Sequence, residues 1–176
     1  YMNRLSEMNG VFVPSRNHLK DLQNNYHIPN LHFISNPNPL SAGLSAVDIA
    51  SRKNANLKKG APIQLLCVGR LAPEKNISFA IKTAHLIQQQ GIRCELTIVG
   101  KGPEWSTLQD LNKRLNTGVN FVGFKDPKEL KDFYLNADFF LLPSLFENQG
   151  LVLLEALSCG TPCMALKENI SAPEMI

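Results

Sequence analysis

The chain has 176 residues, the size of one ordinary domain, and its hydrophobic content of 44% is enough for a packed core. The net charge of +3, from 18 basic and 15 acidic residues, is too small to favour nucleic acid or a strongly acidic partner. No apolar run reaches the roughly 20 residues that cross a bilayer, and no signal peptide is visible. We therefore expect a cytoplasmic protein.

The first part of the chain predicts a small strand–helix–strand unit. Residues 10–14 (GVFVP) are typical of a short buried strand, Ser15 can cap a helix that runs to Tyr26, and residues 31–35 (LHFIS) resemble a second strand. Proline, asparagine and glycine then end regular structure in residues 36–43, and a polar stretch follows. We predict three segments: 1–43, the end of another domain with the start of a linker; 44–62, the linker; and 63–176, the main domain.

From Ile63 onward, apolar runs alternate with segments of helical periodicity. The predicted strands are 63–68, 94–99, 119–122, 138–142 and 162–165, and the predicted helices are 76–90, 104–116, 127–136 and 151–158. This alternation predicts an α/β domain with a Rossmann-like, doubly wound parallel sheet. Ligands of such sheets bind at the carboxyl ends of the strands, so the turns after the strands are the candidate sites.

The turn after the first strand of this domain carries two basic residues. Gly69 lets the backbone leave the sheet sharply, and Arg70 and Lys75 then lie near the end of the strand. Arginine offers a planar fork for phosphate and lysine a mobile charge. The alternative is a solvated turn in which Glu74 pairs with a basic residue. The spacing does not separate the two interpretations.

Two later turns suggest a nucleotide but do not prove it. Residues 100–103 (GKGP) begin like a dinucleotide fingerprint, yet Trp105 stands where its third glycine belongs. We therefore favour a tight strand-to-helix turn over a pyrophosphate cradle. Phe124, after the third strand, is predicted either to line a nucleobase slot or to pack against the core.

Residues 141–164 contain two glutamates, Glu147 and Glu155, with seven residues between them. Glu155 lies in an almost entirely apolar helix, where a carboxylate is costly unless donors reach it. Gly150 opens that helix, and the bare N–H groups of a helix start attract anions. An anion-binding helix start beside two carboxylates that can accept hydrogen bonds from hydroxyl groups fits a sugar diphosphate.

Other chemistries find little support. Cys67, Cys94, Cys159 and Cys163 form no CxxC pair, so we expect buried free thiols rather than a metal or disulfide set. The four histidines lie away from the strand ends of the main sheet, and their spacing suggests neither a catalytic triad nor a metal cluster.

Seven features in the expected order resemble one family. They are VGRLAPEK (68–75), GKGP (100–103), FVGF (121–124), AD..LLPS (137–144), the two spaced glutamates, CGTPCMA (159–165) and APEMI (172–176). The chain resembles the nucleotide-binding half of a retaining glycosyltransferase of the group 1, family 4 type, with the GT-B fold. The likeness covers about residues 63–176. VFVPS and FISNPN more weakly resemble the last strands of the acceptor half.

The resemblance implies a retaining glycosyl transfer, of hexosyltransferase type, from a nucleotide-diphosphate sugar. Arg70 and Lys75 would bind the diphosphate, Glu155 the ribose hydroxyls, and Glu147 the donor sugar, with no metal required. The implied catalytic residues are Glu147, Arg70 and Lys75. The implied donor-binding residues are Gly69, Arg70, Lys75, Phe124, Glu147, Asn148, Gln149, Gly150, Leu151 and Glu155. The acceptor would be a polysaccharide, a lipid-linked glycan or a small glycoside. The resemblance also implies peripheral association with the inner face of a membrane, although no amphipathic basic helix in this sequence supports it.

The sequence departs from the family at three places. Asn76 replaces a glycine, a mild change because asparagine tolerates a left-handed backbone. Gln149 stands where an aromatic residue is frequent, and residues 169–172 lack the family's paired glycines. The family pattern also extends beyond Ile176, so we expect a truncated domain that binds donor but does not complete the reaction alone. A GT-B nucleotide-sugar epimerase, a non-catalytic nucleotide-sugar-binding module and half of a nicotinamide dehydrogenase stay open as less favoured alternatives.

Overall fold

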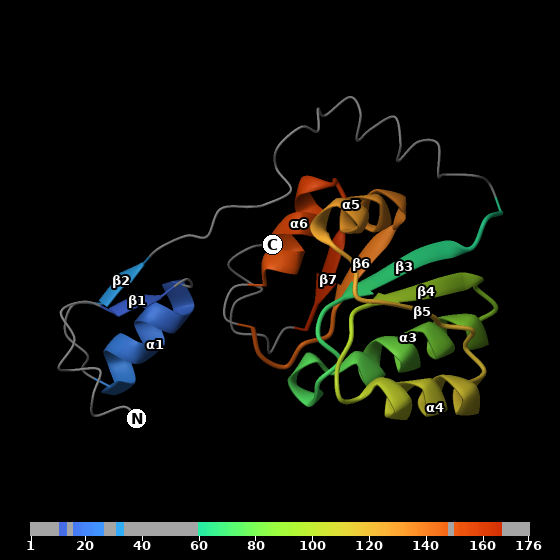
Figure 1. Ribbon diagram of the computed structural model, residues 1–176, viewed down its shortest axis with the longest axis horizontal. Helices are drawn as coiled ribbons and strands as arrows, with labels where there is room; N and C mark the ends of the chain where they lie inside the picture. The colour runs from blue at the N-terminus through green and yellow to red at the C-terminus, as the bar shows by residue number, and fades with distance from the viewer. Residues whose placement is uncertain (1–10, 14–15, 27–30, 34–59, 148–149, 167–176) are drawn as a thin grey trace.

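The computed structural model describes residues 11–13, 16–26, 31–33, 60–147 and 150–166. The N-terminal unit consists of β1 (Val11–Val13), α1 (Arg16–Tyr26) and β2 (Leu31–Phe33), with the two strands paired in parallel (Figure 1). The predicted strand–helix–strand unit is therefore confirmed, whereas the expected cap Ser15 lies outside the described residues. The domain boundaries stay a prediction, because residues 34–59 also lie outside them.

In the described part of the main domain, five strands form one parallel sheet in the order β5-β4-β3-β6-β7. The strands are β3 (Ile63–Val68), β4 (Cys94–Val99), β5 (Asn120–Gly123), β6 (Phe139–Leu142) and β7 (Cys163–Ala165). The chain moves outward from β3 to β5 and then crosses back to β6. The order therefore reverses between β3 and β6, which makes the carboxyl ends of these two strands the expected ligand position. The predicted α/β parallel fold is confirmed.

The helices cover the sheet on both faces. They are the 3₁₀ turn η2 (Pro73–Lys75), α3 (Ile77–Gln89), α4 (Trp105–Leu115), α5 (Pro127–Asn136) and α6 (Leu151–Ser158). Figure 1 shows α3 and α4 on one face and α5 and α6 on the other. The predicted helix 76–90 begins one residue later, because Asn76 has a left-handed backbone (φ 50°) that separates η2 from α3. Asn76 therefore adopts the left-handed conformation that we expected asparagine to tolerate at this position.

A hydrophobic core lies on each side of the sheet. On the α3 side, Ile77, Ala80, Ile81 and Ala84 are buried, as the periodicity of this helix predicts. On the α5 side, Tyr134 and its neighbours pack against Phe140 and α6.

The start of α5 is fixed by a capping box. Asp126 accepts hydrogen bonds from the backbone N–H groups of Lys128 and Glu129, and the Glu129 carboxylate accepts from the N–H of Asp126. An aspartate followed three residues later by a glutamate, at the start of the predicted helix 127–136, predicts such a cap, and the structure confirms it.

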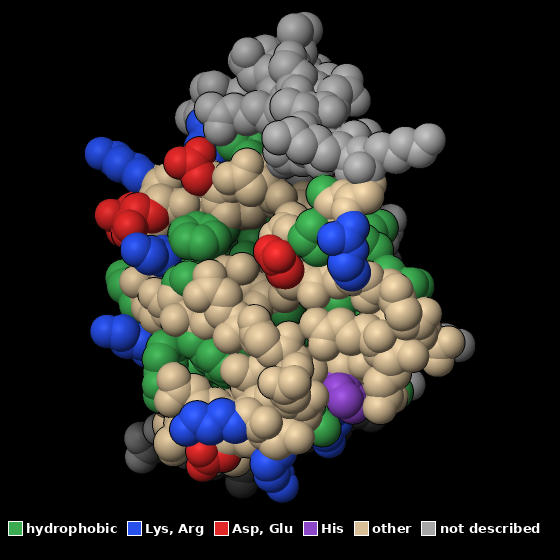
Figure 2. Space-filling view, turned by 90° about the vertical axis from the view of Figure 1, so that its right-hand side faces the viewer, with side chains coloured by type: hydrophobic (Ala, Val, Ile, Leu, Met, Phe, Trp, Pro, Cys, Tyr) green, Lys and Arg blue, Asp and Glu red, His purple; other side chains and the backbone are tan. Residues whose placement is uncertain are grey.

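Figure 2 shows the side of the molecule on which β3 and β4 begin. Neither positive nor negative side chains predominate on this face. Basic and acidic side chains are interspersed on this face. Of the helices that the structure describes, none has the length and apolar character needed to cross a membrane.

Candidate functional site

The turns after β3 and β4 are packed directly against each other. A Cβ on Gly100 would lie 1.8 Å from the carbonyl oxygen of Gly69, and one on Gly102 would lie 2.3 Å from that of Leu71. The N–H of Leu71 donates to the carbonyl of Lys101 at 3.0 Å. The glycines of the GKGP turn are therefore needed for contact between two backbones, and the prediction of a tight turn is confirmed.

Beside these turns, at the carboxyl ends of β3 and β4, lies an open cavity of about 360 Å³. Its lining is mostly apolar but includes three basic residues, and it comprises Val68, Gly69, Arg70, Val99, Gly100, Lys101, Phe124, Lys125 and Leu130. Phe124 is 71% exposed, so its ring is not part of the core. Of the two roles predicted for Phe124, core packing is wrong, and the role in a nucleobase slot stays a prediction.

Arg70 pairs with Glu74. A pair between Glu74 and a basic residue of this turn is what the interpretation as a solvated turn predicts. A hydrogen bond from its own backbone N–H, together with Arg70 and Lys75, lowers the pKa of the Glu74 carboxyl. Both side chains of the pair are exposed, at 68% and 40%, and exposed ion pairs contribute little to stability. Arg70 can therefore exchange this partner for a phosphate at small cost.

Lys75 and Glu147 meet at the point where the strand order reverses. Lys75 Nζ lies 2.5 Å from Glu147 Oε1, and the Ser144 hydroxyl donates to the same oxygen at 2.8 Å. The N–H of Leu145 also donates to the carbonyl of Glu74 at 2.9 Å, which joins the loop after β6 to η2. Only 9% of Glu147 is exposed, so this carboxylate is held by charge and hydrogen bonds in a sheltered place.

Glu155 lies in the second turn of α6 and is half-buried. Burial raises the pKa of its carboxyl, and the hydrogen bond from Tyr134 partly offsets that rise. The Tyr134 hydroxyl donates to Glu155 Oε2 at 2.8 Å. The donor that an acidic residue in an apolar helix requires is therefore the hydroxyl of a tyrosine on α5.

The remaining expected site residues are placed in part. Gly150 has a left-handed backbone (φ 55°), and α6 begins at Leu151, as predicted. Asn148 and Gln149 lie outside the described residues, as do residues 169–172. No hydrogen bond or ion pair described in the structure joins Glu155 to Glu147. The sequence-predicted residues thus form two groups, one on the β3 and β6 turns and one between α5 and α6.

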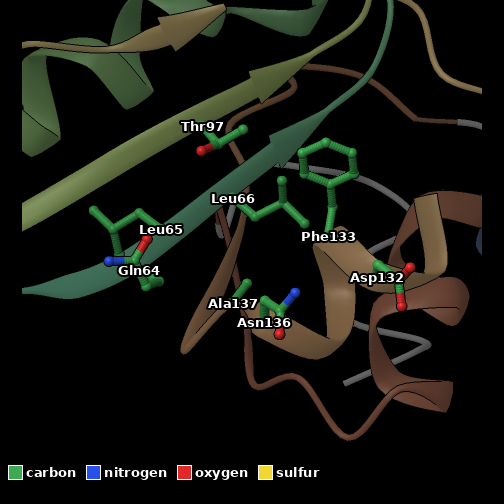
Figure 3. Close-up of a pocket in the computed structure, with 8 residues that line it drawn as sticks. All are labelled: Gln64, Leu65, Leu66, Thr97, Asp132, Phe133, Asn136 and Ala137. Carbon is green, nitrogen blue, oxygen red and sulfur yellow. The ribbon is translucent and has the colours of Figure 1, made fainter. Parts of the chain in front are cut away.

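A second cavity, of about 260 Å³, lies between α5 and the first half of β3. Figure 3 shows its lining, which includes Gln64, Thr97, Asp132 and Asn136. It is set back from the carboxyl ends of the strands and contains none of the predicted site residues.

The cysteines do not contribute to either cavity. All four are free thiols, with Cys67, Cys94 and Cys159 buried and Cys163 partly exposed. Burial raises the pKa of the Cys67 thiol to about 12, so it stays protonated and inert. In the part of the chain that the structure describes, no three histidine, cysteine or acidic side chains gather as metal ligands.

Sequence reasoning missed two residues, Ser144 and Tyr134. The periodicity of the predicted helix 127–136 places Tyr134 on its buried face and no more, although a buried tyrosine hydroxyl needs a partner and Glu155 needs a donor. Taken together, these two requirements could have predicted a hydrogen bond between Tyr134 and Glu155. For Ser144, three residues before Glu147, the sequence held no comparable signal.

The chain is similar to known proteins over most of its length. The family model of glycosyl transferases group 1 matches residues 48–176. A glycosyltransferase of amylovoran biosynthesis, AmsK from Erwinia amylovora, is 35% identical over 130 residues, covering 65% of this chain and 30% of the relative. Alpha-monoglucosyldiacylglycerol synthase from Streptococcus pneumoniae is 29% identical over 171 residues, covering 92% of this chain and 38% of the relative.

Among solved structures, Alr3699/HepE from Anabaena, in complex with UDP and glucose, superposes with a TM-score of 0.76 at 22% identity. The match covers 99% of this chain and 49% of that one. The chain thus spans about a third to a half of the length of these proteins. Because the family match covers well over half of the 176 residues, the chain belongs to the group 1 glycosyl transferases.

Proposed function

We propose that this chain is the donor-binding part of a retaining glycosyltransferase that uses a nucleotide-diphosphate hexose. The observation that carries the proposal is the pair of Lys75 and Glu147 at the reversal of strand order, together with Arg70, which lies in the same turn as Lys75 and lines the cavity at the ends of β3 and β4. Two cations and a sheltered carboxylate at this position suit a ligand with a diphosphate at one end and sugar hydroxyls at the other.

In this proposal, Arg70 and Lys75 bind the diphosphate and stabilise the negative charge that grows on the leaving phosphate. Preorganised charge of this kind is usually the largest catalytic contribution. The leaving phosphate accepts the proton of the acceptor hydroxyl, which attacks on the same face, so the anomeric configuration is retained. Glu147 keeps Lys75 in place and accepts hydrogen bonds from the donor sugar. Since the two cations supply the charge, we propose that no metal is required.

The binding of the nucleoside is assigned to the other residues. The start of α6, at Gly150 and Leu151, adds N–H groups toward the diphosphate, and Glu155 accepts from the ribose. The exposed ring of Phe124 lines the cavity and offers a face for stacking of the base. UDP is the first nucleotide to test, because HepE was solved with UDP and glucose.

The acceptor class rests on the relatives. AmsK takes part in amylovoran biosynthesis and the pneumococcal relative is named a glucosyldiacylglycerol synthase, so we propose a polysaccharide or lipid-linked acceptor. We place the enzyme in the cytoplasm, at the inner face of the membrane. The chain spans less than two fifths of these two relatives, and we expect it to bind donor without completing transfer on its own. The matching family is that of glycosyl transferases, which favours this proposal over an epimerase or a dehydrogenase.

Calorimetric titration with UDP, GDP, ADP and CMP, without metal and then with magnesium, tests the donor site. We expect one diphosphate to bind without metal, and we expect Arg70→Ala and Lys75→Met to weaken it at least about tenfold, the loss of one charge-assisted hydrogen bond. Arg114→Ala, which removes an exposed arginine at the end of α4, is the matched control and should bind as the parent does. Folded protein that binds none of the four nucleotides would contradict the proposal.

A further inference from the structure

The hydrogen bond between Tyr134 and Glu155 joins two helices that the chain forms separately. Tyr134 is on α5 and Glu155 on α6, 21 residues apart, and the helices pack side by side. In α6, which has the sequence LVLLEALS, Glu155 is the one ionisable side chain. The position of its carboxylate therefore depends on what α5 presents to it.

Tyr134 is held rigidly. Its side chain has no exposed surface, and its ring meets that of Phe140 edge-on, with centroids 5.6 Å apart. Its carbonyl oxygen accepts a hydrogen bond from the buried Thr161 hydroxyl at 2.5 Å. Because ring and backbone are both fixed, the hydroxyl points to one place, and that place is occupied by Glu155 Oε2.

The two oxygens of Glu155 are consequently different. Oε2 accepts the hydrogen bond from the Tyr134 hydroxyl, whereas Oε1 makes no hydrogen bond to a described residue. No side-chain oxygen or nitrogen that the structure describes is both buried and without a partner, and Glu155 is only half-buried. As far as the described residues go, Oε1 is thus left available to a ligand, in an orientation that Tyr134 sets.

We propose that Tyr134 is a positioning residue for sugar recognition in the nucleotide: it orients the Glu155 carboxylate so that the site distinguishes ribose from deoxyribose. This inference rests on the proposed function. It adds Tyr134 to the site residues already assigned, which are the two glutamates and the turn that carries Arg70 and Lys75. A carboxylate fixed at one oxygen offers the other to a ribose hydroxyl without first losing rotamer freedom. Without the tyrosine hydroxyl, the carboxylate is free to rotate and is more readily protonated.

The test compares UDP with 2′-deoxy-UDP and 3′-deoxy-UDP by calorimetry on the parent protein and on Tyr134→Phe. Phenylalanine keeps the ring that packs on Phe140 and removes only the hydroxyl. We expect the parent to prefer UDP over the deoxy analogue that lacks the recognised hydroxyl by about tenfold, the value of one charge-assisted hydrogen bond. In Tyr134→Phe the preference should fall below about threefold, while affinity for that analogue is unchanged.

Thr161→Val is the matched control. It removes the hydrogen bond to the Tyr134 carbonyl but leaves the Tyr134 hydroxyl, so it should lower the melting temperature and keep the preference for ribose. A pH series adds a readout that a purely structural role would not move. In Tyr134→Phe, the loss of UDP affinity on acidification should begin at a higher pH, because the hydrogen bond that lowers the pKa of Glu155 is gone.

Three outcomes would overturn the inference. The first is an unchanged preference in Tyr134→Phe, and the second is an equal loss of affinity for UDP and both deoxy analogues. The third is a parent that binds UDP with no preference for ribose, which would leave the donor site standing and remove the role of Glu155 with it. A parent that binds no nucleotide would instead overturn the proposed function itself.

If Tyr134→Phe does not fold, fluorotyrosine in place of the three tyrosines keeps size nearly constant and changes the acidity of the hydroxyl. The preference for ribose should then change, and an unaltered preference would contradict the proposal.

Discussion

Lys75 and Glu147 are 72 residues apart, yet Nζ of the first lies 2.5 Å from Oε1 of the second. They meet because β3 and β6 are neighbours in the sheet, and each residue lies in the loop after its strand. With 23% and 10% of their side chains exposed, the two charges are largely sheltered from solvent. The ion pair therefore links the two loops that the proposed donor would touch.

Removing one member of this pair should be costly. Lys75→Met removes the cation that pairs with the sheltered Glu147 carboxylate, and we expect the free energy of unfolding to fall by about 1–3 kcal/mol. Urea unfolding measures the change. Lys113→Met is the control, since its pair with Asp110 is 3.8 Å long and both side chains are more than two-thirds exposed. Equal effects of the two substitutions would contradict the importance assigned to Lys75.

Gly102→Ala tests whether the GKGP turn is needed for packing. The new Cβ would lie 2.3 Å from the Leu71 carbonyl oxygen, so the two turns must separate, and we expect a loss of at least about 3 kcal/mol or failure to fold. Gly118→Ala is the control: it has a positive φ (66°) but an open surrounding, and it should cost only about 1 kcal/mol. A Gly102→Ala protein of normal stability that no longer binds nucleotide would instead support a phosphate cradle.

Asp138 joins the starts of β3 and β6. Its carboxylate accepts from the N–H of Gln64 at 2.8 Å, and its own N–H donates to the Gln64 carbonyl at 2.8 Å. Asp138→Ala leaves the Gln64 N–H without this partner, and we expect a loss of about 1–2 kcal/mol in thermal or urea unfolding. Asp138→Asn keeps an acceptor and should cost less; a larger loss for asparagine than for alanine would be inconsistent with this role.

Glu155 should make stability depend on pH in a defined direction. Burial raises the pKa of its carboxyl above the usual 4.5, so the folded protein binds this proton more tightly than the unfolded chain does. The contribution to stability is present in full below about pH 4.5 and is lost as the pH rises through the folded pKa. We expect Glu155→Gln to become more stable relative to the parent between about pH 4 and pH 7.

Glu129 supplies a control of opposite sign for this measurement. Hydrogen bonds from Lys125 and from the N–H of Asp126 lower the pKa of its carboxyl, so its contribution is present above the unfolded pKa and is lost on acidification. Glu129→Gln should therefore differ from the parent most at neutral pH and least in acid. If Glu155→Gln followed the same trend as Glu129→Gln, the environment assigned to Glu155 would be wrong.

The sequence by itself determined the parallel fold and the position of the candidate site. The 3.6-residue periodicity of Ile77, Ala80, Ile81 and Ala84 requires a face to bury, and apolar runs of strand length between such helices require a parallel sheet. The expectation that phosphate-binding groups gather at Gly69 to Lys75 followed from the same alternation, because ligands bind where parallel strands end. These features are local patterns, or direct consequences of the order of the elements.

Only the tertiary structure decided which side chains meet. Glu147 reaches Lys75 because β6 lies next to β3 in the sheet. No local pattern in the sequence encodes that strand order. The same is true of Tyr134, whose apolar ring predicted burial but whose hydroxyl found Glu155 only because α5 packs on α6. Periodicity encodes which face of an element is buried. The partner of a polar group on that face is set by the packing of elements that are distant in the chain.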